Sequence, residues 1–287
     1  MRIGELEIQS VLAGWFGLDG GSMFGVVPRV LWDRGQPADE RNRITMAMRP
    51  LLIRCPDGRS ILIDAGIGPR LDAKQQSIYA YRSPHGGVVG ALARLGVAPE
   101  QISDVIVSHL HFDHAAGLLR AGPDGRLRPT FPRARVHLQE DAWDWARSPS
   151  EWDRASFFAG DFAVWEQELA LVLLRGDAEI AAGVRVQATA GHTPGHQIAV
   201  VGDGAPEGAV VYCADLIPTA DHVRLPYIMA YDHQPLRTLD EKKVLLAQAL
   251  EEDWILAFEH DPRLAACRLR ERDGRVEPGA AVCLNVP

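Results

Sequence analysis

Apolar residues recur at two spacings along the chain, and each spacing predicts a different kind of element. Apolar runs bounded by turn residues predict strands at residues 43–54 and 60–64, joined in a hairpin by PDGR. Helical spacing of apolar residues predicts a helix in HGGVVGALARLG, which ends at Gly96. The apolar run DVIVSH then predicts a buried strand, so helix and strand alternate here.

The second half of the chain is richer in predicted strands. Strands are expected at ARVHLQ, GVRVQATAG, HQIAVVG, AVVYCADLI and WILAFEHD, with helices at EDAWDWARS and LDEKKVLLAQALEED and a terminal hairpin around Asp273 and Gly274. Both halves of the chain contain strands with interspersed helices, which fits two sheets packed together and covered on their outer faces by helices. The pattern predicts an α/β fold, a four-layer αββα sandwich. No repeat, low-complexity tract or linker interrupts it, so we expect one domain over residues 1–287.

Composition and charge narrow the classes of partner. The chain has 38 acidic and 30 basic residues and a net charge of -8, which disfavours nucleic acid, because phosphate backbones are bound by clustered Lys and Arg. The cysteines form no CxxC pair, and we expect them to be reduced and mostly buried: Cys55, Cys213, Cys267 and Cys283.

The N-terminal segment does not look like a secretory signal. Glu5 and Glu7 stand where a signal needs its apolar stretch, and no window reaches the ~18 apolar residues of a membrane span. We therefore expect a cytoplasmic protein with no membrane partner.

The segment VIVSHLHFDHAAGLL carries a dense group of potential metal ligands. His109 and His111 stand two positions apart at the end of a predicted strand, so both imidazoles are expected on one side, where they can bind one ion. A turn at FDHAAG would direct Asp113 and His114 toward a neighbouring second position. Three buried histidines and a carboxylate without an ion would leave costly unsatisfied polar groups, so the cluster predicts metal binding.

Further candidate ligands follow later apolar strands. His192 stands in TAGHTPGHQ, Asp215 in VVYCADLIP and His260 in ILAFEHDP. Each of these residues alone is more typical of a turn cap than of a metal ligand. Together they lie at the carboxyl ends of strands, where an α/β fold gathers functional residues into one crevice. Catalytic zinc takes imidazole and carboxylate ligands and keeps an open position.

These motifs resemble the metallo-β-lactamase superfamily. SHLHFDHAAG matches its HxHxDH motif, and IDAGIG, GHTPGH, CADLIP and FEHD occur in its order along the chain. The resemblance implies the αββα sandwich and two Zn²⁺ ions, with Asp64 orienting a ligand from behind. The ligand set that it implies is His109, His111 and His192 for one ion, Asp113, His114 and His260 for the other, and Asp215 as the bridge.

Two other segments are similar to a narrower group. FGLDGGSMFGVVPRVLWDR and YIMAYDHQP resemble the YtnP-type quorum-quenching lactonases, which are similar to methyl parathion hydrolase and the N-acyl homoserine lactonases. Some of those lactonases place a catalytic Tyr three positions beyond the bridging Asp, where this chain has Pro218. Tyr231 and Tyr227 are candidates to replace it.

The implied dinuclear site favours hydrolysis of a neutral ester. Two zinc ions about 3.5 to 4 Å apart can share a hydroxide, because zinc lowers the pKa of bound water to about 7. Two divalent ions carry four positive charges, and Asp113, Asp215 and the hydroxide compensate three of them. The remaining positive charge would stabilise the carbonyl oxygen of an ester, which becomes negative in the tetrahedral intermediate. We expect a metal-dependent hydrolase that opens lactones, in particular N-acyl homoserine lactones, with Asp113 passing a proton to the leaving alkoxide.

Several alternatives stay open from the sequence. A phosphotriesterase or arylesterase would use the same metals, and a non-catalytic scaffold would share the fold, although none of the seven candidate ligands is lost. A thioesterase for an anionic glutathione substrate is disfavoured by the lack of an evident basic patch. A homodimer is possible.

Some conspicuous side chains have two interpretations. We expect His196 to lie behind the ligands, and His222 and His233 to be solvated loop histidines. The apolar group GGSMFGVVP could line an acyl-chain pocket or belong to the core; its members are Met23, Phe24, Val26 and Val27.

Overall fold

Two large sheets form the centre of the molecule. In the computed structural model, which describes residues 1–285, each of these sheets has seven strands, and two two-stranded sheets accompany them. The first large sheet has the order β1 (Arg2–Ile3), β2 (Leu6–Ser10), β5 (Leu51–Arg54), β6 (Ser60–Ile63), β7 (Asp104–Ile106), β10 (Arg135–Gln139) and β11 (Ala170–Leu174). The second has the order β12 (Ala178–Ala181), β13 (Val184–Ala188), β14 (Gln197–Val201), β15 (Val210–Tyr212), β16 (Ile255–Ala257), β17 (Ala266–Arg272) and β18 (Arg275–Ala281). The small sheets pair β3 (Gly14–Asp19) with β4 (Arg43–Met48) and β8 (Leu119–Ala121) with β9 (Leu127–Pro129).

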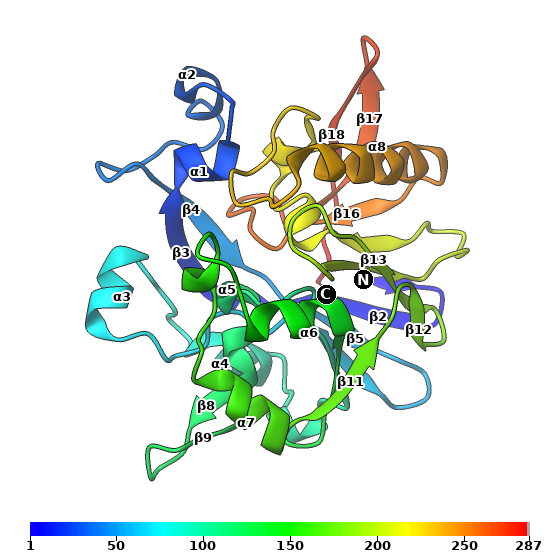
Figure 1. The fold of residues 1–287 in the computed structure, drawn as a ribbon. Helices are drawn as coiled ribbons and strands as arrows, with labels where there is room; N and C mark the ends of the chain where they lie inside the picture. Colours follow the sequence, from blue (N-terminus) through cyan, green and yellow to red (C-terminus); the bar gives the residue numbers. More distant parts are fainter. Residues whose placement is uncertain (286–287) are drawn as a thin grey trace.

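Helices cover the outer faces of both sheets (Figure 1). The α-helices are α1 (Gly20–Phe24), α2 (Arg29–Trp32), α3 (Ala73–Ile78), α4 (Gly87–Arg94), α5 (Phe112–Ala115), α6 (Glu140–Arg147), α7 (Asp161–Glu168) and α8 (Pro235–Glu251). The 3-10 helices are η1 (Pro99–Gln101), η2 (Ala116–Leu118), η3 (Arg154–Ser156), η4 (Ala214–Leu216) and η5 (Ala220–Val223). Helix α8 lies over the second sheet, and α4 and α6 lie beside the first. The four-layer αββα sandwich is therefore confirmed.

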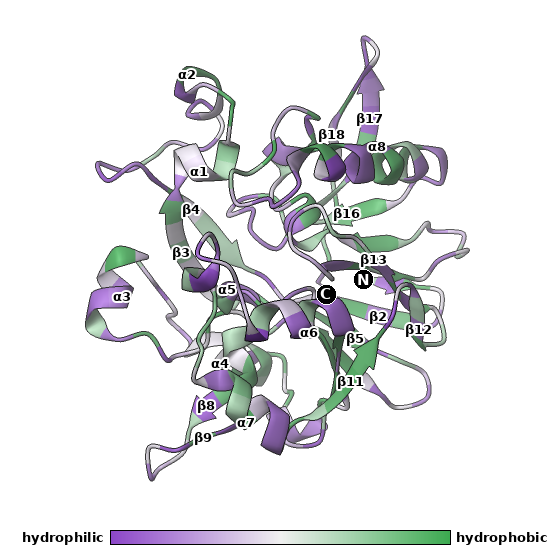
Figure 2. Ribbon diagram, in the orientation of Figure 1, coloured by the Kyte–Doolittle hydropathy of each residue, from purple (hydrophilic) through white to green (hydrophobic). Residues whose placement is uncertain are grey.

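The two sheets share a buried apolar layer. Ile8, Ile53 and Ile106 of the first sheet belong to the same buried cluster as Val201 and Ile255 of the second. Strand β16 is hydrophobic along its length, whereas the outer end of β17 is hydrophilic (Figure 2). The central strands are buried on both faces, which explains why the sequence shows continuous apolar runs rather than strict alternation.

One predicted strand is wrong. The run at residues 43–54 is two strands in different sheets: β4 pairs with β3, whereas β5 pairs with β2 and β6. The break falls at Pro50, whose ring fixes φ and removes a backbone donor, so one strand cannot continue through it. The predicted hairpin therefore survives as β5 and β6, and β4 belongs to a separate ribbon beside the site.

The expectations about the terminal hairpin and the cysteines are confirmed. The hairpin turn at Asp273 and Gly274 joins β17 to β18, with positive φ at both residues, as a tight hairpin turn requires. All four cysteines are free, and only Cys283 is exposed. Among the described residues, no helix is long and apolar enough to cross a membrane.

Candidate metal centre

The central motif folds as a loop and a single helical turn beyond β7. The strand ends at Ile106, so His109 and His111 lie in the loop after it rather than on the strand itself. His111 caps α5, and its carbonyl accepts the backbone N–H groups of His114 and Ala115. This turn separates Asp113 and His114 from the two earlier histidines, as the FDHAAG sequence predicted.

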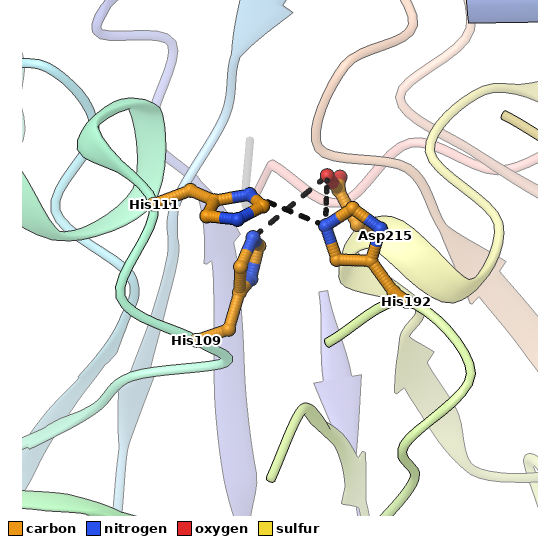
Figure 3. Close-up of side chains that lie close together, drawn as sticks. All are labelled: His109, His111, His192 and Asp215. Atoms are coloured by element: carbon orange, nitrogen blue, oxygen red, sulfur yellow. Dashed lines mark hydrogen bonds and ion pairs between the residues drawn. The ribbon is translucent and has the colours of Figure 1, made fainter. Parts of the chain in front are cut away.

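The structure brings four of the predicted residues into one group (Figure 3). The group consists of His109, His111, His192 and Asp215, and the closest ligand atoms of all four lie within 4.8 Å of one another. Asp215 Oδ2 is 3.2 Å from His192 Nε2 and 3.9 Å from His109 Nε2. His192 Nε2 is in turn 3.3 Å from His111 Nδ1. Side chains from three distant segments therefore converge on one point.

The remaining predicted residues form a second group beside the first. Asp113, His114 and His260 also offer ligand atoms within 4.8 Å of one another. The second oxygen of Asp215, Oδ1, lies 3.4 Å from His114 Nε2 and 3.2 Å from His260 Nε2. Each oxygen of Asp215 thus faces a different group, which is the geometry that a bridging carboxylate requires.

The chemistry of these side chains fits metal ions. His109 Nε2 and Asp215 Oδ1 are buried and have no hydrogen-bond partner among the described residues, an arrangement that is costly unless another group binds them. Burial and neighbouring histidines hold the pKa of His109 well below its usual value, which keeps the imidazole neutral as metal binding requires. Burial alone would raise the pKa of Asp215, but the adjacent imidazoles of His114, His192 and His260 lower it well below its usual range.

A buried polar cluster holds His114 from behind. Asp64 Oδ2 is 3.0 Å and Glu259 Oε2 2.8 Å from His114 Nδ1. Asp64 also accepts hydrogen bonds from the backbone N–H and the hydroxyl of Ser108 and from the hydroxyl of Tyr212. A hydrogen on Nδ1 would leave Nε2 of His114 free to bind a metal. Asp64 therefore has the position that the resemblance implied.

His192 and Asp215 are held in the same way. Asp232 Oδ1 lies 2.7 Å from His192 Nδ1, and both side chains are buried. His196 is not a member of either group; its Nε2 accepts the backbone N–H of Asp215 at 3.2 Å, and its Nδ1 lies 2.6 Å from the Thr189 hydroxyl. His196 thus lies behind the site, as expected.

The site opens into a pocket with a volume of about 210 Å³. Its floor is formed by ligand candidates, and its walls are mainly apolar and aromatic. The lining residues other than the ligand candidates are Leu18, Met23, Tyr79, Phe112, Trp152, Asp153, Ala155, Ser156, Met229 and Tyr231. In the part of the chain that the structure describes, no Lys or Arg lines this pocket. The protein side chains of the pocket therefore offer no Lys or Arg cation to an anionic substrate.

The pocket lining shows which members of the apolar group and which of the two candidate tyrosines face the site. Met23 lines it, Phe24 and Val27 are buried in the core, and Val26 is exposed. Tyr231 lines the pocket, and burial raises its pKa to about 12, so the phenol stays protonated at neutral pH. Tyr227 does not line it, and its hydroxyl instead accepts a hydrogen bond from Arg224.

The expectation of solvated loop histidines is wrong. His222 is 1% exposed, stacks on Phe24 and hydrogen-bonds with the Thr219 hydroxyl and the Met23 carbonyl. His233 is largely buried beside Asp153. The α1 segment covers His222, whereas His233 lies against Trp145 of α6. No local sequence pattern indicates either contact.

Two supporting carboxylates were missed by the sequence reasoning. Glu259 directly precedes His260 in FEHD, and a charged residue that follows an apolar strand was a usable signal. Burial raises the pKa of Glu259 to about 7. Asp232 had no such signal, because its partner His192 is 40 positions away.

This arrangement identifies the class of protein. The family model of the metallo-beta-lactamase superfamily matches residues 51–260, which includes every candidate ligand. The chain belongs to the metallo-β-lactamase superfamily.

Similar proteins include lactonases. An N-acyl homoserine lactonase from a Bacillus species is 28% identical over 174 residues, 61% of this chain and 62% of the relative. The N-acyl homoserine lactonase AiiB of Agrobacterium fabrum is 25% identical over 138 residues, 41% of this chain and 50% of the relative. The chain therefore aligns with less than two thirds of the length of these relatives.

Solved structures match over nearly the whole chain. A probable metal-dependent hydrolase from Staphylococcus aureus is 29% identical, with a TM-score of 0.88 over 99% of this chain and 98% of that one. The dizinc quorum-quenching lactonase AidC, solved with a homoserine product, has a TM-score of 0.77 at 19% identity over 98% of this chain and 97% of that one. At that identity, the similarity to AidC supports the fold.

Proposed function

We propose that this protein is a metal-dependent hydrolase that opens lactone rings, with N-acyl homoserine lactones as the substrate class. The observation that carries the proposal is the pair of ligand groups that share Asp215 at the floor of a pocket without Lys or Arg. Such a pocket favours a neutral ester over phosphate or glutathione substrates, which need cationic groups. The lactonases among the similar proteins support the same substrate class.

We assign seven residues as ligands of two Zn²⁺ ions. His109, His111 and His192 would hold one ion, Asp113, His114 and His260 the other, and Asp215 would bridge the two. When bound, the ions would supply a hydroxide between them at neutral pH and would polarise the substrate carbonyl. Other divalent transition metals have similar ligand preferences, so the identity of the metal belongs to the test.

The residues of the chain have distinct tasks in this reaction. Asp113 lines the pocket at the edge of the second group, where it can pass the proton of the attacking hydroxide to the ring oxygen as the ester bond breaks, which leaves a carboxylate and an alcohol. Tyr231, protonated at neutral pH, can donate a hydrogen bond to the substrate from the wall. Asp64 and Asp232 hold the imidazoles of His114 and His192 in place.

The sequence-based expectations on organisation fit this proposal. The apolar layer that both sheets share supports a single folding unit. The homodimer and the cytoplasmic location stay predictions.

A substrate panel on the metal-loaded protein tests the function. Lactones, phosphotriesters, aryl esters and thioesters are compared by kcat/KM, with the metal content of each preparation measured by elemental analysis. We expect two ions per chain, the highest kcat/KM on lactones and loss of activity on chelation. A faster reaction with phosphotriesters would favour the phosphotriesterase alternative, and no turnover of any ester by the loaded protein would favour the non-catalytic scaffold.

A further inference from the structure

The mouth of the pocket carries an exposed aromatic side chain on a fixed backbone. Trp152 lines the pocket and is 71% exposed. Single exposed apolar side chains are common on protein surfaces, so exposure alone does not indicate a binding site. Trp152 differs from the other exposed apolar residues because it forms part of the wall of the proposed active site.

Hydrogen bonds fix the turn that presents Trp152. Its backbone N–H donates to the Ser150 hydroxyl at 3.2 Å, and the Arg154 N–H donates to the Ser150 carbonyl at 3.0 Å. The next residue, Asp153, is buried and accepts hydrogen bonds from the Trp145 indole at 2.6 Å and from the Ser150 hydroxyl at 3.0 Å. The indole of Trp152 therefore projects from a preorganised backbone, although no other aromatic ring packs against it among residues 1–285.

The size of the pocket requires part of a tailed substrate to lie outside it. Its volume of about 210 Å³ is below the roughly 300–1,000 Å³ of pockets that enclose a drug-sized ligand. A substrate with a long acyl tail exceeds this space when its lactone ring lies over the ligand groups. An acyl tail must then leave through the mouth, where Trp152 offers a large apolar surface.

We propose that Trp152 is a specificity-determining residue that covers the apolar tail of the substrate at the pocket mouth. This inference rests on the proposed function, and it adds that the protein selects long acyl chains over short ones through this side chain. An aromatic ring is suited to the task, since it buries a large apolar area with few rotatable bonds.

Variants at Trp152 test the inference through a ratio of substrates. In the wild type, kcat/KM should be higher for N-decanoyl than for N-butanoyl homoserine lactone. In Trp152→Ala the ratio should fall about tenfold, equivalent to ~1.4 kcal/mol. Trp152→Phe should keep most of the ratio. The control Val244→Ala removes an apolar side chain that is 69% exposed on α8 and outside this pocket, and it should leave the ratio unchanged.

Binding separates this inference from the proposed function. Calorimetry on the metal-loaded protein compares the ring-opened N-decanoyl and N-butanoyl homoserines, which need no turnover. If lactones are not hydrolysed but Trp152→Ala lowers the decanoyl-to-butanoyl affinity ratio, the proposed function fails and the role of Trp152 stands. The inference is overturned if Trp152→Ala leaves the decanoyl-to-butanoyl ratios of kcat/KM and of affinity unchanged, including the case in which it weakens binding of both homoserines equally. It is also overturned if the wild type shows no preference for the longer tail.

Discussion

Asp232→Asn tests how far a residue outside the ligand set controls the metal centre. Asp232 contacts His192 at 2.7 Å, and both side chains are almost completely buried. Burial alone would lower the pKa of His192, but Asp215 and Asp232 raise it above its usual value, so Asp232 makes the imidazole more basic. Asn keeps the shape and an acceptor oxygen but removes the charge, and charge-assisted hydrogen bonds are roughly twice as strong as neutral ones.

Asp232→Asn should lower the affinity of the protein for one of the two ions. Side chains that hydrogen-bond to a metal-binding histidine typically contribute about 10- to 100-fold to metal affinity. Because Asn retains the hydrogen bond, we expect the affinity to fall by about 10- to 30-fold, which corresponds to about 1.4 to 2 kcal/mol. Binding of the ion that we assign to His109, His111 and His192 should weaken, while the ion that we assign to His260 should keep its affinity. The assay measures bound metal per chain across a series of free-zinc concentrations set by a chelator.

Asp104→Asn is a matched control. Asp104 Oδ1 lies 2.8 Å from His137 Nε2, also in a buried Asp–His pair, but neither residue belongs to the metal groups. This variant should lower the free energy of unfolding and leave metal binding unchanged. The reasoning is refuted if Asp232→Asn binds both ions with wild-type affinity, or if the two variants weaken metal binding equally.

Substitutions of Asp215, of two histidine ligand candidates and of a buried lysine test other parts of the structure. Asp215→Ala should lower kcat/KM by more than about a hundredfold, because two like-charged ions would face each other with less compensation; a variant with both metals and full activity would show that Asp215 does not bridge. His260→Ala and His192→Ala should each lose a different ion, so their cobalt(II) absorption spectra should differ, and an unchanged metal content in His260→Ala would contradict the assignment. Lys242 is fully buried and donates to the carbonyls of Arg224 and Tyr227, and burial lowers its pKa to about 7. The unfolded chain then binds more protons between pH 7 and the ordinary lysine value of about 10.4, so the free energy of unfolding should rise with pH there, by up to about 1.4 kcal/mol per unit, relative to Lys242→Met. Urea unfolding of both proteins at pH 7.5 and about 9 checks the sign, and parallel pH profiles would refute it.

The sequence determined much of the local structure and the ligand inventory. Helix α4, the pair β10 and α6, and the β17–β18 hairpin follow from apolar spacing and turn residues, which act over a few positions. The close spacing of His109, His111, Asp113 and His114 places them in one loop whatever the rest of the fold does. The positions after the later strands indicated His192, Asp215 and His260, because strand ends are where such folds collect functional groups.

Only the tertiary structure decided how these residues work together. It brought the seven candidates together in the two groups that the resemblance implied, with one oxygen of Asp215 facing each. It also placed Asp232 behind His192 and Glu259 behind His114. It also buried His222 and put Trp152 at the mouth of the pocket. These contacts join segments tens of positions apart, and they depend on how two sheets and their connecting loops pack. A short-range sequence pattern encodes which face of an element is apolar, but it does not encode which distant side chain will meet that face.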